Sequence, residues 1–78
     1  MFTDSRPPGG AVLSLMVNGE ARVLPAPATV FELLTSMGLV GKRVAVERNG
    51  DIVPKGLHAG TALADGDRLE IVVAVGGG

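Results

Sequence analysis

Apolar and polar side chains alternate along two stretches near the start of the chain, which predicts a pair of β-strands. The segment "AVLSLMV" covers residues 11–17, and "EARVL" covers residues 20–24. Between them lies Asn18-Gly19, a dipeptide that favours the two-residue type I′ turn of a β-hairpin. The alternation directs one set of side chains of the first strand towards a core: Leu13, Leu15 and Val17.

The same pattern recurs in the second half of the chain. A strand over residues 43–48 and a short strand over residues 51–53 flank Asn49-Gly50, which predicts a second hairpin, and Pro54 ends it. Val44 and Val46 are expected to face inward. A last strand is predicted from Arg68 to about Val75, after a turn formed by "ADGD". Its core-facing residues are expected to be Leu69, Ile71, Val73 and Val75.

Between the two hairpins, the segment "TVFELLTSMG" predicts a helix over residues 29–38. Thr29 is an N-cap residue, Glu32 stands three positions later as its capping-box partner, and Gly38 ends the helix. The apolar positions recur with helical spacing and form one stripe: Val30, Leu33, Leu34 and Met37.

The predicted element order is therefore β-β-α-β-β-β. One helix covers only one face of a sheet, so we expect an α+β fold in which a mixed sheet of four to five strands wraps around the helix. The first and last strands would be parallel and central. This is the β-grasp, or ubiquitin-like, architecture. We expect the domain over residues 11–75, a disordered extension over residues 1–10, and a flexible tail over residues 76–78.

Composition narrows the class of protein further. With 78 residues and 46% hydrophobic content, the chain suits one small domain with a single core. Two aromatic residues and a net charge of −1 argue against a nucleic-acid binder. The absence of cysteine excludes disulfides and thiolate catalysis, and a single histidine cannot build a zinc cluster, so we expect no metal. Without a long apolar run or the pattern of a secretory leader, a cytoplasmic protein with no membrane partner is expected.

The sequence ends in three glycines, Gly76, Gly77 and Gly78. A glycine-rich end is often only a frayed terminus. The alternative is a chemical role, because ATP can convert a terminal carboxylate into an acyl-adenylate that a sulfur or amine nucleophile then attacks. The carboxylate must enter the narrow site of another enzyme, and glycine threads there without a β-carbon.

Residues 12–78 resemble the ThiS family, the sulfur carriers of thiamine biosynthesis. The resemblance rests on "NGDIVP", "LADGDRLEIV" and "VGGG", supported by "VNGE" and by the helix segment. It implies that Gly78 is adenylated by a ThiF-like adenylyltransferase with ATP, receives sulfur from a sulfur-donor protein as a thiocarboxylate, and delivers it to thiazole synthase. The chain would then be a protein cosubstrate, bind no cofactor itself, and use Gly76 and Gly77 for threading.

Two positions depart from the family pattern, and two other classes of protein stay open. Lys55 stands where arginine is common, and Val73 where a polar residue or histidine is often found. Neither changes the carrier chemistry, although either can shift partner preference. The alternatives are a molybdopterin-type sulfur carrier or ubiquitin-like modifier, whose tails more often end in Ser-Gly-Gly, and a plain β-grasp binding module.

Several polar residues invite a catalytic interpretation, but simpler explanations are favoured. Asp65 and Asp67 are expected to hold a turn through local backbone amides. His58 is expected in a loop, without a nucleophile or base beside it. The remaining candidate is a basic cluster, either facing a partner or solvated: Lys42, Arg43 and Arg48.

Alternation also predicts which residues lie on the sheet face away from the helix. These are Val12, Ser14 and Met16 of the first strand and Glu70, Val72 and Ala74 of the last. An apolar patch beside a reactive tail suits transient docking. We therefore expect Met16, Val72 and Ala74 to contact the partner enzymes.

Overall fold

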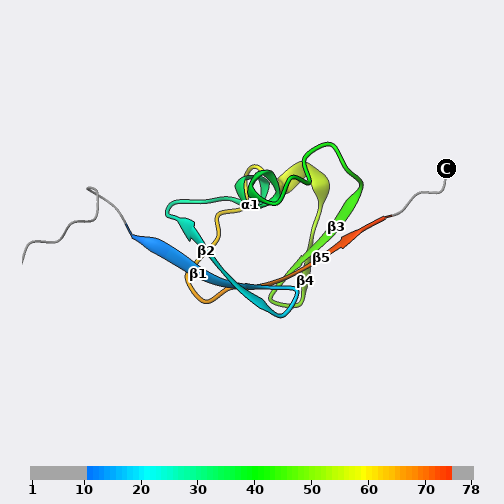
Figure 1. Cartoon of the computed structure of the whole chain (residues 1–78). Helices are drawn as coiled ribbons and strands as arrows, with labels where there is room; N and C mark the ends of the chain where they lie inside the picture. Colours follow the sequence, from blue (N-terminus) through cyan, green and yellow to red (C-terminus); the bar gives the residue numbers. More distant parts are fainter. Residues whose placement is uncertain (1–10, 75–78) are drawn as a thin grey trace, which may run out of the picture.

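The computed structural model describes residues 11–74 and shows a five-stranded mixed sheet curved around one helix (Figure 1). The elements are β1 (Val12–Val17), β2 (Glu20–Pro25), α1 (Val30–Ser36), β3 (Val44–Arg48), β4 (Asp51–Val53), the 3-10 helix η1 (Lys55–Leu57) and β5 (Arg68–Val73). The strand order is β2-β1-β5-β3-β4, and β1 and β5 are parallel. The predicted β-grasp fold is confirmed, with five strands. The predicted extension at residues 1–10 and the tail lie outside the described residues.

Both Asn-Gly dipeptides form the turns that the sequence predicts. Asn18 and Gly19 have φ angles of 52° and 82°, and Asn49 and Gly50 have 52° and 90°. Two successive left-handed residues define the type I′ geometry, which asparagine and glycine tolerate best. The Asn18 side chain also accepts from the Ile71 N–H at 2.7 Å and donates to the Ile71 carbonyl at 3.0 Å. It therefore prolongs the two-residue ladder between β1 and β5.

Helix α1 begins at the predicted capping box. The Thr29 hydroxyl accepts from the Glu32 N–H at 3.2 Å, and the Glu32 carboxylate accepts from the Thr29 N–H at 2.8 Å. A helix of seven residues is too short to be stable alone, so its packing on the sheet must hold it. Val30 and Leu33 are fully buried against the sheet. Within residues 11–74, no helix is long and apolar enough to cross a membrane.

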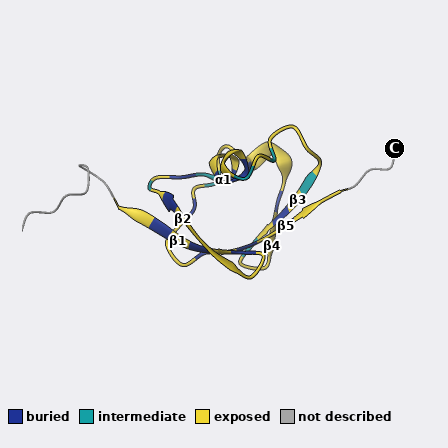
Figure 2. Ribbon diagram, in the orientation of Figure 1, coloured by how far each residue is buried: buried dark blue, intermediate teal, exposed yellow. Residues whose placement is uncertain are grey.

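The core lies between α1 and the concave face of the sheet (Figure 2). Alternation along β1 and β5 places the buried side chains as predicted, with Leu15 at 2% exposure and Leu69 at 0%. The prediction for Val73 is wrong, since 39% of this residue is exposed. By Val73, strand β5 has run beyond the part of the sheet that the helix covers, and its neighbour Val44 is only half-buried. Strand β5 ends at Val73, and Val75 lies outside the described residues.

Candidate functional site

Strand β5 fixes the point from which the C-terminal segment leaves the domain. It lies between β1 and β3, with Leu69 and Ile71 buried in the core. Just after the strand, the Ala74 N–H donates to the Arg43 carbonyl at 2.9 Å. The β3 side therefore holds the backbone up to Ala74, whereas the pairing with β1 ends at Leu69 and the Asn18 side chain extends it to Ile71. The predicted reactive residues Gly76, Gly77 and Gly78 lie beyond the described part of the chain.

The predicted docking residues are exposed on the outer sheet face, but they do not form one compact spot. Val72 is 64% exposed and Met16 39% exposed, and Ala74 is also exposed. Met16 pairs with Arg68 at the start of β5. Val72 lies four residues further along, about 13 Å at the usual rise of a strand. Only Val72 and Ala74 therefore lie beside the tail.

Two features of this outer face escaped the sequence interpretation. Ile52 of β4 is 64% exposed and adds to the apolar surface. The alternation of side chains in that short strand could have predicted that Ile52 faces outward. Glu47 of β3 stands directly opposite Glu70 of β5. Like charges in register are destabilising, by roughly 0.2–1 kcal/mol for such cross-strand pairs. The pairing places two carboxylates beside Arg68 on the part of the outer face near Val72, so this part is charged as well as apolar.

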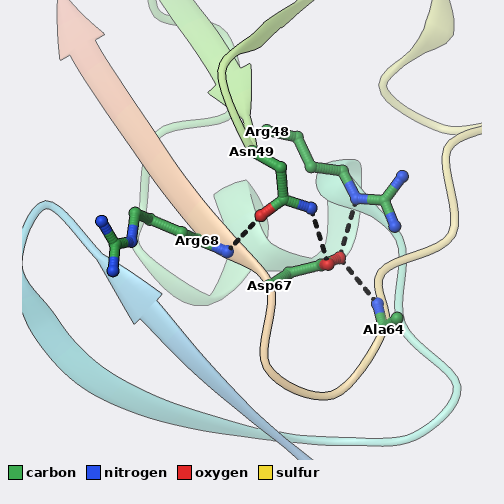
Figure 3. A network of polar contacts seen from close by, with 5 residues as sticks. All are labelled: Arg48, Asn49, Ala64, Asp67 and Arg68. Atoms are coloured by element: carbon green, nitrogen blue, oxygen red, sulfur yellow. Dashed lines mark hydrogen bonds and ion pairs between the residues drawn. The ribbon is translucent and has the colours of Figure 1, made fainter.

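Asp67 is the centre of a polar network that ties two turns together (Figure 3). Its carboxylate accepts from Arg48 Nε at 2.7 Å, from Asn49 Nδ2 at 3.0 Å and from the Ala64 N–H at 2.8 Å. The Asn49 side chain in turn accepts from the Arg68 N–H at 2.9 Å. Asp67 therefore has a structural role.

The neighbouring Asp65 also binds backbone, since its carboxylate accepts from the Ser14 N–H at 2.6 Å. The predicted binding of a local backbone amide is confirmed for Asp67, whereas Asp65 instead ties the turn to strand β1, 51 residues away. In the described part of the chain, no three histidine or carboxylate side chains gather as metal ligands do.

Burial raises the pKa of Asp67, but the hydrogen bonds from Arg48, Ala64 and Asn49 and the charge of Arg48 outweigh it, so its pKa lies below the ordinary value of 3.8. The unfolded chain then binds a proton at higher pH than the folded one. The stability that this carboxylate contributes is complete above the ordinary value and is lost as the pH falls through the folded-state pKa.

We expect Asp67→Asn to lower the free energy of unfolding at neutral pH by about 1.5–3 kcal/mol, because a charged hydrogen-bond acceptor is removed from a buried network. Urea unfolding at neutral pH and below pH 3.8 measures the effect. The deficit relative to the native sequence should shrink as the pH falls from 3.8 through the lower folded-state pKa, because the native carboxylate then becomes protonated as well. Exposed Asp51→Asn is the control. A deficit that does not change with pH would contradict this role.

The basic cluster predicted from the sequence is rearranged. Arg48 points to Asp67 and leaves the cluster. Lys42 and Arg43 instead line one pocket together with Lys55 of η1. His58 follows η1 as its C-cap, and its ring is buried, with Nε2 3.1 Å from the Val53 carbonyl. The expected loop histidine is thus a packed structural residue.

Fold and site together define a class of protein, a ubiquitin-like β-grasp domain whose central strand leads into a glycine-rich segment. Residues 15–78 match the model of the ThiS family. The chain is 50% identical over 66 residues to a thiazole synthase of Paramagnetospirillum magneticum, covering 85% of this chain and 20% of that protein. It is 46% identical over 50 residues to the sulfur carrier protein ThiS of Bacillus subtilis, covering 64% of this chain and 76% of that protein.

A solved structure of a thiamine biosynthesis protein (ThiS) from Geobacter metallireducens superimposes with a TM-score of 0.70 at 30% identity, covering 85% of this chain and all of that one. The chain belongs to the ThiS family. It spans about a fifth of the length of the curated thiazole synthases that it matches.

Proposed function

We propose that this protein is a sulfur carrier of thiamine biosynthesis. The Gly78 carboxylate attacks the α-phosphate of ATP in the site of a ThiF-like adenylyltransferase, and pyrophosphate leaves. A persulfide on a sulfur-donor protein then attacks the acyl carbon, and AMP leaves with the bonding electron pair. A thiol cleaves the S–S bond of the resulting acyl disulfide, which releases the thiocarboxylate and leaves a disulfide between the thiol and the donor. The resulting thiocarboxylate donates its sulfur for thiazole formation by thiazole synthase. ATP is bound by the partner, and this chain is the cosubstrate.

One observation carries this proposal: the buried central strand β5 is held to Arg43 at Ala74, directly before the sequence Val-Gly-Gly-Gly. A rigid domain presents the segment, and the glycines supply the freedom and the narrow width that threading requires. The sulfur carrier from Bacillus subtilis is a relative at 46% identity. Kinship with ThiS proteins favours the thiamine type of carrier over the molybdopterin type.

The outer sheet face is the proposed docking surface for the partner enzymes. Val72 and Ala74 are the exposed apolar residues nearest the tail, and Met16 extends the surface along β1. Glu47 and Glu70 add a negative charge that a basic partner surface complements. Thiazole synthase is the proposed sulfur acceptor, because curated proteins of that name include a region similar to this chain. We place the reaction in the cytoplasm.

ATP–pyrophosphate exchange tests the proposal. The adenylyltransferase from the same organism is expected to exchange labelled pyrophosphate into ATP only when this chain is present. A folded chain that supports no exchange contradicts the proposal. Equal exchange by a chain that lacks residues 76–78 contradicts it as well.

A further inference from the structure

A pocket of about 220 Å³ opens between α1, the loop that follows it, and η1. It lies on the helix side of the molecule, away from the outer sheet face. Its lining combines apolar side chains with three cations: Phe31, Leu34 and Val44 with Lys42, Arg43 and Lys55.

Backbone hydrogen bonds fix the walls of this pocket. The Phe31 N–H donates to the His58 carbonyl at 2.9 Å, which joins α1 to the segment around η1. The Leu39 N–H donates to the Leu34 carbonyl at 2.9 Å and ties the loop to the end of α1. The pocket therefore needs no ligand to form, and binding there costs little ordering.

The size of the pocket indicates what can fill it. Sites for drug-sized ligands and cofactors usually occupy about 300–1,000 Å³, so this one suits a single side chain better than a small molecule. Phe31 is 44% exposed and Val40 49% exposed at its edge. An apolar anchor from another protein would cover both, as central anchors do in interfaces.

The charge of the rim indicates what surrounds such an anchor. No carboxylate lines the pocket. Within residues 11–74, the ion pair found is that of Arg48 and Asp67, so Lys42, Arg43 and Lys55 have no acidic partner there. Three neighbouring cations favour an occupant with Asp or Glu beside its apolar side chain.

The pocket also lies beside the exit of the tail. The carbonyl of Arg43, one of its lining residues, accepts from the Ala74 N–H, and Val44 pairs with Val73. We propose that this pocket is a second docking site for the protein that captures the tail. That protein inserts an apolar side chain flanked by carboxylates. Identifying that protein as the adenylyltransferase rests on the proposed function. The enzyme would then grip the domain on both sides of β5.

Two measurements test this site, and the first is independent of the carrier function. The isotopically labelled protein is titrated with the peptide Glu-Asp-Leu-Asp-Glu, and amide shifts are followed by NMR. We expect shifts confined to residues 31–34, 39–44 and 55–59, which weaken severalfold in Lys42→Glu but not in Arg22→Glu. Absence of shifts at millimolar peptide overturns the proposal. Equal shifts with serine in place of the peptide's leucine also overturn it.

The second measurement is the KM for this chain in the exchange reaction. Lys42→Glu and Lys55→Glu are each expected to raise KM about tenfold without changing kcat, whereas Arg22→Glu, an exposed cation on β2, leaves KM within about twofold. Equal KM values for all three variants overturn the docking site while exchange itself continues. Absence of exchange with the native sequence instead contradicts the proposed function. The peptide titration alone then shows whether the pocket is a docking site.

Discussion

Replacing Gly77 by tryptophan is expected to abolish ATP–pyrophosphate exchange while thermal unfolding stays unchanged. A bulky side chain next to the reactive carboxylate would block entry into a narrow adenylation site, and any β-carbon restricts the φ and ψ angles open to glycine. Deleting Gly78 should have the same effect, because the carboxylate is moved back by one residue. Exchange rates and circular dichroism melting curves measure both variants.

Gly60→Ala is the matched control for a glycine substitution. Gly60 does not have a left-handed φ, and an added Cβ would meet only the Leu57 carbonyl oxygen, at 3.9 Å. This variant should exchange at the native rate. Native-like exchange by Gly77→Trp would show that the tail is not threaded through a narrow channel.

Val72→Asp is expected to weaken binding to the adenylyltransferase by tens- to thousands-fold, since an unpaired charge in an interface costs on the order of 2–5 kcal/mol. Val72 is 64% exposed and lies two residues before Ala74. The new charge also stands near Glu70, on the same side of the same strand. Isothermal titration calorimetry measures the affinity, and circular dichroism should stay native.

Val23→Asp provides a matched control on the same face. Val23 is 59% exposed on strand β2, the edge of the sheet, which β1 separates from β5. The Val23→Asp variant should bind the enzyme with the affinity of the native sequence. Affinity of Val72→Asp within a few-fold of Val23→Asp would assign recognition to the tail or to the pocket beside α1.

Local signals predicted much of the fold because they depend on neighbouring residues alone. The Asn-Gly turns require left-handed φ angles, and the capping box joins Thr29 to Glu32 across three positions. Burial at the end of β5 was not predictable in this way. The alternation of apolar and polar side chains predicts which face of the sheet Val73 occupies, but it does not predict where the helix that covers this face ends.

The site was predictable only in part, for a related reason. Asp67 was expected to hold a turn, yet its partner Arg48 lies 19 residues away, a pairing that depends on the register of β3 and β5. The same register sets Glu47 against Glu70. Lys55 joins the pocket of Lys42 because η1 packs beside α1. Such contacts come from tertiary structure and leave no periodic trace in the sequence.

Intact-mass spectrometry of the protein after incubation with the adenylyltransferase, ATP and a sulfur source tests the central claim most directly. The carrier function predicts a mass increase equal to the replacement of one carboxylate oxygen by sulfur, located at Gly78 by fragmentation. The increase should vanish without ATP and in the chain that lacks Gly78. An unchanged mass under conditions where exchange proceeds, or sulfur attached to any other residue, would contradict it.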